Sequence, residues 1–274
     1  SYYANAAYTY DKRYTLSASG RIDQSNLFGV KANQRGVPLY SAGLAWNVNE
    51  EDFYSLAWLP YLKLRATYGY NGNTDRSLSA YTTARYLPGF ISMTGLNYAQ
   101  VVNAPNPELR WERVRIFNLG LDFSTRKGTF SGSLEYYRKN GLDLIGETPF
   151  PPSSGITRFK GNTAITEGNG IDLTLNAHIR SGNFSWQPAL LFAYAQDKIK
   201  RYLTTFTAAS YLLGVNPAEG KPMYSFYSYR WAGLDPQTGD PQGYLNGQAS
   251  REYAKIISTA NRDNMVYSGP SRPP

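Results

Sequence analysis

Cysteine is absent from this chain of 274 residues. The absence excludes a disulfide framework, thiol catalysis and any cysteine-ligated zinc or iron–sulfur site. Long apolar runs are also missing, because the longest uninterrupted one covers only residues 189–195, whereas a membrane-spanning helix needs about 20 such residues. A membrane β-barrel is still compatible with the mean hydropathy of −0.47, since alternating strands average to mild polarity.

Charged residues are scarce, at 18% of the chain against about 25% in soluble domains. Basic residues dominate among them, with 28 Lys and Arg against 20 Asp and Glu. Aromatic residues are abundant instead, with 24 Tyr, 12 Phe and 5 Trp. Rings in this number must be stacked, buried or placed at an interface. The composition therefore excludes a disordered chain, and the length fits one large domain or part of a larger one.

Helical periodicity is hard to find, and the recurring pattern is period two, as a strand with two different faces requires. Leu62, Leu64 and Ala66, for example, alternate with Lys63 and Arg65. Eight strands of roughly nine to fourteen residues are predicted, longer than the five or six usual in soluble sheets and suited to a tilted membrane crossing. They cover residues 2–10, 14–23, 40–49, 62–71, 117–124, 130–139, 171–179 and 184–197.

The predicted connections alternate between short and long. The short ones are 11–13, 125–128 and 180–183, with a moderate one at 50–60, and the long ones are 24–38, 72–114, 145–169 and everything after 198. Tight turns at one end and long loops at the other are typical of an outer-membrane barrel. Pro188 argues mildly against a closed barrel because it removes a ladder donor inside the last predicted strand, where we expect a bulge.

Alternation alone does not say which face of the sheet is dry, since a soluble barrel or sandwich puts its apolar face inside. The polar face here consists largely of Ser, Thr, Asn and Gly rather than Lys and Glu, which favours a membrane barrel. Rings near strand ends suit interfacial girdles; they are Tyr10, Tyr40, Tyr68, Tyr70, Phe123, Phe130, Trp186 and Tyr194. The alternative is a soluble β-sandwich or barrel that binds glycans or nucleic acid, although Lys and Arg are spread over many loops rather than gathered in a stripe.

Basic residues cluster at strand ends beside the long loops. They are Arg110, Arg113, Arg115, Arg138, Lys139, Lys198, Lys200 and Arg201. On the barrel interpretation this level is the outer leaflet, so part of the positive charge is expected to meet phosphates of outer-membrane lipopolysaccharide. The alternative is that these are ordinary solvated strand ends.

The chain resembles a known family in a series of stretches that occur in a fixed order over nearly its whole length. They are YDKRY at 10–14, SAGLAW at 41–46 followed by NEE at 49–51, LKLRATYG at 62–69, NPELRWE at 106–112, NLGLDF at 118–123, GSLEYY at 132–137 and GLDPQTGDP at 233–241. In these stretches the chain is similar to the SusC/RagA-type TonB-dependent transporters of the Gram-negative outer membrane.

The resemblance implies an all-β, antiparallel transmembrane barrel of 22 strands with an N-terminal plug, a SusD-like surface lipoprotein as lid, and energy from the TonB–ExbB–ExbD complex. Residues 1–274 are then expected to form part of the single barrel domain, in its C-terminal half, with signal peptide and plug domain absent. The start at Ser1 shows no export signal. The implied function is outer-membrane uptake of nutrients such as oligosaccharides or peptides.

No catalytic constellation is indicated. His178 is the only histidine, and with no cysteine the chain lacks the usual ligand set of a zinc site; a polar residue in the barrel lumen is the expectation for it. A Ser-His-Asp set is not credible either, so we expect no enzyme activity, cofactor or metal. Residues 235–240 resemble a small calcium loop but are first of all a turn signal.

Aromatic residues in the long loops are the best candidates for substrate contacts, because ring faces stack on sugars and on peptide side chains. The candidate substrate-binding residues are Tyr81, Tyr86, Tyr227, Tyr229 and Trp231. The alternative for all five is that the loops pack on themselves.

Overall fold

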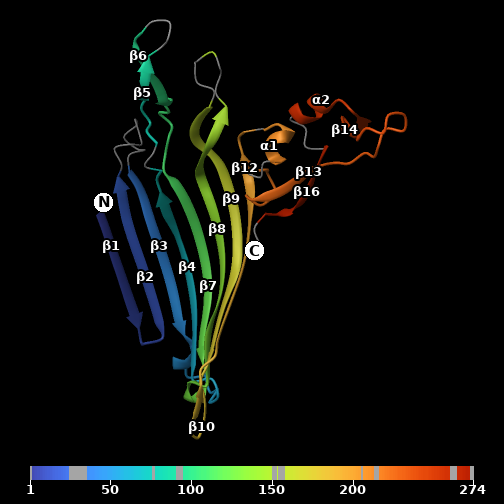
Figure 1. The fold of residues 1–274 in the computed structure, drawn as a ribbon. Coiled ribbons are helices and arrows are strands. Elements are labelled where there is room, and N and C mark those ends of the chain that lie inside the picture. The colour runs from blue at the N-terminus through green and yellow to red at the C-terminus, as the bar shows by residue number, and fades with distance from the viewer. Residues whose placement is uncertain are drawn as a thin grey trace.

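A computed structural model describes residues 2–24, 36–75, 78–90, 95–149, 153, 158–204, 206–212, 216–259 and 264–271. Its main feature is an antiparallel sheet with the strand order β1-β2-β3-β4-β7-β8-β9-β12. The strands are β1 (Tyr2–Tyr10), β2 (Tyr14–Gln24), β3 (Gly36–Asn47), β4 (Tyr61–Asn73), β7 (Glu112–Ser124), β8 (Phe130–Pro149), β9 (Arg158–Ala177) and β12 (Ala189–Tyr202). The predicted all-β, antiparallel barrel wall of eight strands is confirmed, and the sheet remains open because β1 and β12 are its end strands (Figure 1).

Alternate residues of each strand point to opposite faces of the sheet. The register between neighbouring strands aligns the apolar residues of all eight strands on one face. One row crosses all eight strands and is apolar throughout: Tyr8, Leu16, Leu44, Ala66, Leu119, Tyr136, Ile171 and Tyr194. The next row toward the turns is also apolar: Tyr10, Tyr14, Trp46, Leu64, Leu121, Leu134, Leu173 and Phe192. We call this side the apolar face and the other side the polar face.

The apolar face stays open in the described part of the chain. Leu16, Leu44 and Phe192 keep 60, 53 and 53% of their surface exposed. A soluble sandwich buries such residues against a second sheet, and an apolar patch of this extent marks contact with a partner or a membrane. The face therefore fits the outside of a membrane barrel better than the inside of a soluble one.

The apolar band runs obliquely to the strands. One row further toward the loops is apolar on the first five strands, with Ala6, Ala18, Ala42, Tyr68 and Phe117, and polar on the last three, with Arg138, Asn169 and Gln196. Strands that cross a membrane at a tilt of about 35–45° produce this displacement. The band thus has the slope that the wall of a barrel requires.

The turns gather at one end of the sheet and the loops at the other (Figure 1). Asp11 and Lys12 adopt positive φ of 48° and 54° in the β1–β2 turn. Glu51 connects three residues at the turn end of the sheet. Its carboxylate accepts hydrogen bonds from the Trp46 indole at 2.8 Å, from Arg13 at 3.2 Å and from the Tyr14 hydroxyl. These bonds lower the pKa of Glu51 below its ordinary value, the Tyr14 bond most strongly.

Two details of the turn end differ from the predictions. The strand predicted at 184–197 is divided into β11 (Phe184–Trp186) and β12, because Pro188 has no N–H for the ladder; its carbonyl accepts the Ala177 N–H at 3.0 Å. β11 instead pairs with β10 (Ile179–Ser181) in a small hairpin. His178 lies between β9 and β10, where Arg180 donates a hydrogen bond to it at 2.8 Å, so the strand predicted over 171–179 is wrong at its end, and β9 stops at Ala177. The lumen position expected for His178 stays a prediction.

The long loops carry structure of their own. The strands β8 and β9 extend to 20 residues each, so the loop between them is shorter than the predicted loop 145–169. The remaining elements are η2 (Val48–Glu50), β5 (Thr83–Phe90), β6 (Asn97–Asn103), η3 (Arg126–Gly128), α1 (Ala208–Leu212), β13 (Ser225–Tyr229), β14 (Gly243–Leu245), β15 (Gln248–Ser250), α2 (Tyr253–Ser258) and β16 (Met265–Pro270). No helix among the described residues is long and apolar enough to span a membrane.

Candidate functional site

The polar face carries a charged network at the centre of the sheet. Arg65 on β4 donates to both Asp122 oxygens, at 2.7 and 2.9 Å, and to Glu135 at 2.6 Å. We call Arg65, Asp122 and Glu135 the inner triad. It contains one cation and two carboxylates, so a negative charge remains in excess.

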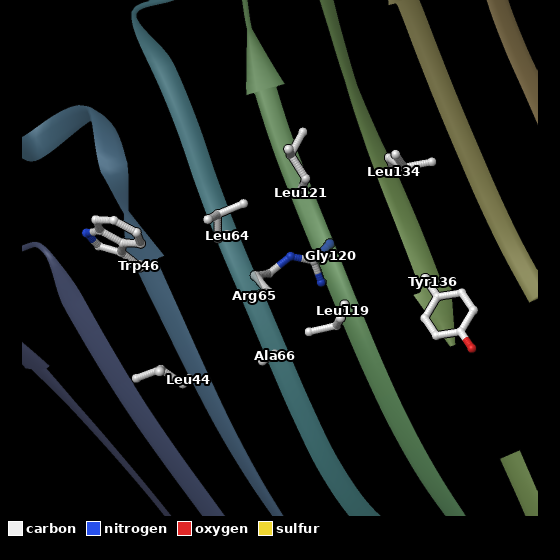
Figure 2. Close-up of a pocket in the computed structure, with 10 residues that line it drawn as sticks. All are labelled: Leu44, Trp46, Leu64, Arg65, Ala66, Leu119, Gly120, Leu121, Leu134 and Tyr136. Carbon is white, nitrogen blue, oxygen red and sulfur yellow. The ribbon is translucent and has the colours of Figure 1, made fainter. Parts of the chain in front are cut away.

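Gly120 explains how Arg65 reaches two strands away. Arg65, Gly120 and Glu135 lie in one row across β4, β7 and β8, and Figure 2 shows the Arg65 side chain extending toward Gly120. A Cβ atom at position 120 would stand 3.0 Å from Arg65 Nη2, which is closer than side chains normally pack. The missing side chain therefore leaves the path to Glu135 open.

A groove of about 390 Å³ lies over the centre of the sheet (Figure 2). Its apolar lining comes from residues of the apolar face, including Leu44, Trp46, Leu64, Leu121 and Leu134. Since these residues belong to the continuous apolar band, we assign the groove to the surface that meets lipid and not to substrate binding.

The five predicted substrate contacts fall into two separate groups at the loop end. Tyr81 and Tyr86 lie at the β5–β6 hairpin, and Tyr227, Tyr229 and Trp231 lie on and after β13, on the other side of the loop end (Figure 1). Tyr86 is 82% exposed and is not among the residues that line the pocket beside Trp231. The structure thus does not bring the five residues into one site.

Tyr227 packs within its own loop. Its ring lies 5.8 Å from the ring of Tyr211 and 5.8 Å from that of Tyr267, measured between centroids. This is the arrangement expected if the loop packs on itself. The substrate role predicted for Tyr227 therefore stays a prediction with an alternative structural explanation.

Tyr229 and Trp231 line a pocket of about 320 Å³ together with Tyr253, Ile256 and Ile257 of α2. Trp231 is exposed over 62% of its surface, while burial raises the pKa of the Tyr229 phenol. Beside it, the Arg230 guanidinium stacks over the Tyr244 ring at 4.5 Å. An aromatic and aliphatic pocket of this kind suits a sugar ring or an apolar peptide side chain.

The α2 residues of this pocket were not predicted from the sequence. They lie more than twenty positions after Trp231, on a helix of 6 residues, and the only available signal was the short apolar pair Ile256 and Ile257. A helix this short leaves no recognisable periodicity.

Residues 235–240 form the predicted turn. Asp235 Oδ1 accepts the backbone N–H groups of Gln237 at 2.9 Å and Thr238 at 3.0 Å. Arg251 pairs with Asp235 at 3.3 Å and with Asp240 at 2.9 Å. The carboxylates therefore serve the turn and one arginine, and in the described part of the chain no group of three or more His, Cys, Asp or Glu is placed to hold a metal ion.

The comparisons with known proteins agree with this architecture. The family described as TonB dependent receptor-like, beta-barrel matches residues 1–270. Among curated relatives, TonB-dependent receptor P39 of Formosa agariphila is 30% identical over 85% of this chain and 22% of its own length. TonB-dependent receptor SusC of Bacteroides thetaiotaomicron is 26% identical over 73% of this chain and 21% of its own length.

A solved structure of the RagAB peptide transporter superimposes with a TM-score of 0.75 at 23% identity, over 97% of this chain and 29% of that one. This likeness supports the fold. The chain spans about a fifth of the length of the curated relatives that it matches. On the family match, the chain belongs to the TonB-dependent receptors and represents a stretch of their β-barrel.

Proposed function

We propose that this chain forms part of the barrel wall and extracellular loops of a TonB-dependent importer that takes up oligosaccharides or peptides across the outer membrane of a Gram-negative bacterium. The observation that carries the proposal is the tilted apolar band over eight strands, with tight turns at one end and long loops at the other. Residues 1–274 belong, on this proposal, to a single barrel domain whose plug lies elsewhere in the protein.

No bond chemistry is needed for this function. The loops capture the substrate, the plug gates the lumen, and the TonB–ExbB–ExbD complex moves the plug. A SusD-like surface lipoprotein covers the loop end as a lid. The RagAB structure is described as a peptide transporter, which makes peptides a suitable first substrate class to test.

The soluble alternative, a glycan- or nucleic-acid-binding sandwich, is disfavoured by family membership and by the exposed apolar face. Detergent dependence and gel mobility test the difference. An intact barrel needs detergent and migrates differently before and after boiling. A protein that stays soluble without detergent and shows no such shift contradicts the proposal.

The substrate role of the loop pocket is tested with Trp231→Ala in the whole transporter. Trp231, Tyr229, Tyr81, Tyr86 and Tyr227 are the proposed contacts, and Trp231 is the most exposed ring of the pocket. We expect uptake of the substrate to fall about tenfold or more, by analogy with aromatic rings that stack on nucleic-acid bases, where removal of one ring costs on the order of 1–3 kcal/mol. Uptake is measured with a labelled oligosaccharide or peptide library.

The matched control is Trp58→Ala. Trp58 is also 62% exposed but lies at the turn end, before β4. It should leave uptake unchanged. Equal loss in both variants, or no loss in Trp231→Ala with normal barrel assembly, rejects the substrate role of the pocket.

A further inference from the structure

A group of cations follows the loop-side edge of the apolar band. On β7, Arg115 and Arg113 come two and four residues before Phe117; on β8, Arg138 comes two residues after Tyr136. On β12, Lys198 comes four residues after Tyr194. Because alternate residues share a face, these side chains lie on the apolar face, about 7 to 14 Å beyond the last ring of their own strand, and Arg115 lies opposite the Tyr70 ring of β4.

Two carboxylates hold four of the cations of this edge in pairs. Asp143 accepts Arg110 at 2.5 Å and Arg113 at 2.7 Å. Glu167 accepts Arg138 at 3.3 Å and Lys198 at 3.1 Å. Each carboxylate neutralises only one of its two partners, so each trio keeps one positive charge.

The cations of these pairs are more exposed to the surroundings than the carboxylates. The side chains of Asp143 and Glu167 are only 14 and 19% exposed, whereas those of Arg113 and Arg138 are 43 and 56% exposed. Arg115 adds a further cation, bonded at 3.2 Å to the neutral amide of Asn140. The surface that faces outward therefore offers guanidinium groups whose hydrogen-bond donors are only partly used.

The positive edge is confined to one part of the wall. In the described strands β1, β2 and β3, the apolar-face positions at the loop end are Tyr2, Ile22, Gln24, Pro38 and Tyr40, with no cation among them. Lys139 was predicted to belong to the same group of basic strand ends. It lies on the polar face instead, opposite Gly168 and Ile116. The cations thus form a localised patch and not a uniform girdle.

Interfacial rings mark the headgroup level of a membrane, and the patch begins in the row of the Tyr70 ring and continues toward the loops. We propose that Arg113, Arg115, Arg138 and Lys198 bind the phosphate groups of a lipid headgroup, that of the phosphorylated glycolipid of the outer leaflet. This inference rests on the proposed barrel and its orientation. Arginine suits the role because its planar fork bonds two phosphate oxygens at once, and Lys198 adds a point charge.

The test uses the whole transporter, purified in mild detergent, freed of lipid and titrated with bis-phosphorylated lipid A under native mass spectrometry. The variant is Arg113→Gln with Arg138→Gln. It leaves Asp143 paired with Arg110 and Glu167 paired with Lys198, so no carboxylate loses its last partner. The control is Lys63→Gln with Lys139→Gln, which removes the same charge from the polar face.

We expect the variant to bind lipid A about tenfold more weakly, because each basic residue near an anionic headgroup layer contributes severalfold in affinity. The control should bind like the unchanged protein, and lipid A without phosphates should bind all three proteins equally weakly. Equal binding by variant and unchanged protein overturns the proposal, as does an equal loss in the control.

Inorganic phosphate distinguishes the source of the bound group. If it displaces lipid A at an equal phosphate concentration, the patch is a site for free phosphate and the lipid assignment is wrong. Substrate uptake in the same strains is a separate readout. If the unchanged protein takes up no substrate, the transport proposal is rejected, whatever the affinity for lipid A. If uptake is normal and the variant binds lipid A as strongly as the unchanged protein, only the lipid site is rejected.

Discussion

The two faces of the wall hold charge in opposite proportions. On the polar face one arginine, Arg65, serves two carboxylates. At the loop end of the apolar face each carboxylate, Asp143 or Glu167, serves two cations. Between these clusters, the two central rows of the apolar face contain no charged residue.

The difference follows from the solvent that each face meets. Water in a barrel lumen screens a surplus negative charge, whereas hydrocarbon tolerates none. A surplus positive charge becomes favourable only where anionic headgroups begin. The ratio of cations to carboxylates in a cluster thus indicates where that cluster lies relative to the bilayer.

The largest effect is expected when a charge is placed on the apolar face at the centre of the bilayer. Leu173→Arg places a cation in the apolar row, and we expect it to destabilise the barrel by about 2 to 4 kcal/mol. Thr174→Arg, one residue further on the polar face, should cost about 0.5 kcal/mol or less. The measurement is urea unfolding of the whole transporter in lipid vesicles. Equal losses for the two variants contradict the assignment of the faces.

A smaller effect is expected from the inner triad. Arg65→Ala removes the cation that Asp122 and Glu135 share, and we expect a loss of about 1 to 2 kcal/mol, limited by screening in the aqueous lumen. Arg65→Lys should recover part of the loss, because an ammonium group keeps the charge but not the fork. The same unfolding measurement applies, and full recovery by lysine argues that charge alone matters.

The smallest effect concerns the loops, outside the membrane. Hydrogen bonds from the backbone of Gln237 and Thr238 lower the pKa of Asp235 below its ordinary value near 3.8. Because the folded pKa is depressed, the charged form stabilises the turn above about pH 4, and this contribution is lost as the pH falls through the lower folded value. Asp240 and Arg251 are the other charged groups at the turn.

Amide exchange at Gln237 and Thr238, corrected for intrinsic rates, measures this effect. Protection should decrease between pH 5 and pH 3 in the unchanged protein. Asp235→Asn keeps the acceptor oxygen without its charge, so it should remove most of the pH dependence. An identical pH dependence in both proteins contradicts the role assigned to the Asp235 charge.

Much of the wall was predictable because period two depends only on neighbouring residues. The alternation of Leu62, Leu64 and Ala66 gave both the strand and its face, and turn and loop lengths gave the two ends. The same alternation also places the adjacent residues Arg138 and Lys139 on opposite faces, so only Arg138 belongs to the edge of the apolar band.

Contacts between distant segments were not predictable from one sequence. Arg65 and Glu135 are 70 positions apart, and their pairing depends on strand order and on Gly120 between them. The pocket beside Trp231 depends likewise on how α2 packs against β14, which brings Tyr253, Ile256 and Ile257 beside Tyr229 and Trp231. Local patterns carry no information about such placements, so the substrate contacts were the least complete of the predictions.

In a barrel wall of this kind the apolar face meets lipid and the polar face meets water. Since this chain has no cysteine, nitroxide labels can be placed at Leu173→Cys and Thr174→Cys in the whole transporter, with any cysteines elsewhere replaced. In lipid vesicles, the label at 173 should collide mainly with oxygen and the label at 174 mainly with a water-soluble nickel chelate. Access of the nickel chelate to 173 equal to that at 174 would contradict this assignment of the two faces.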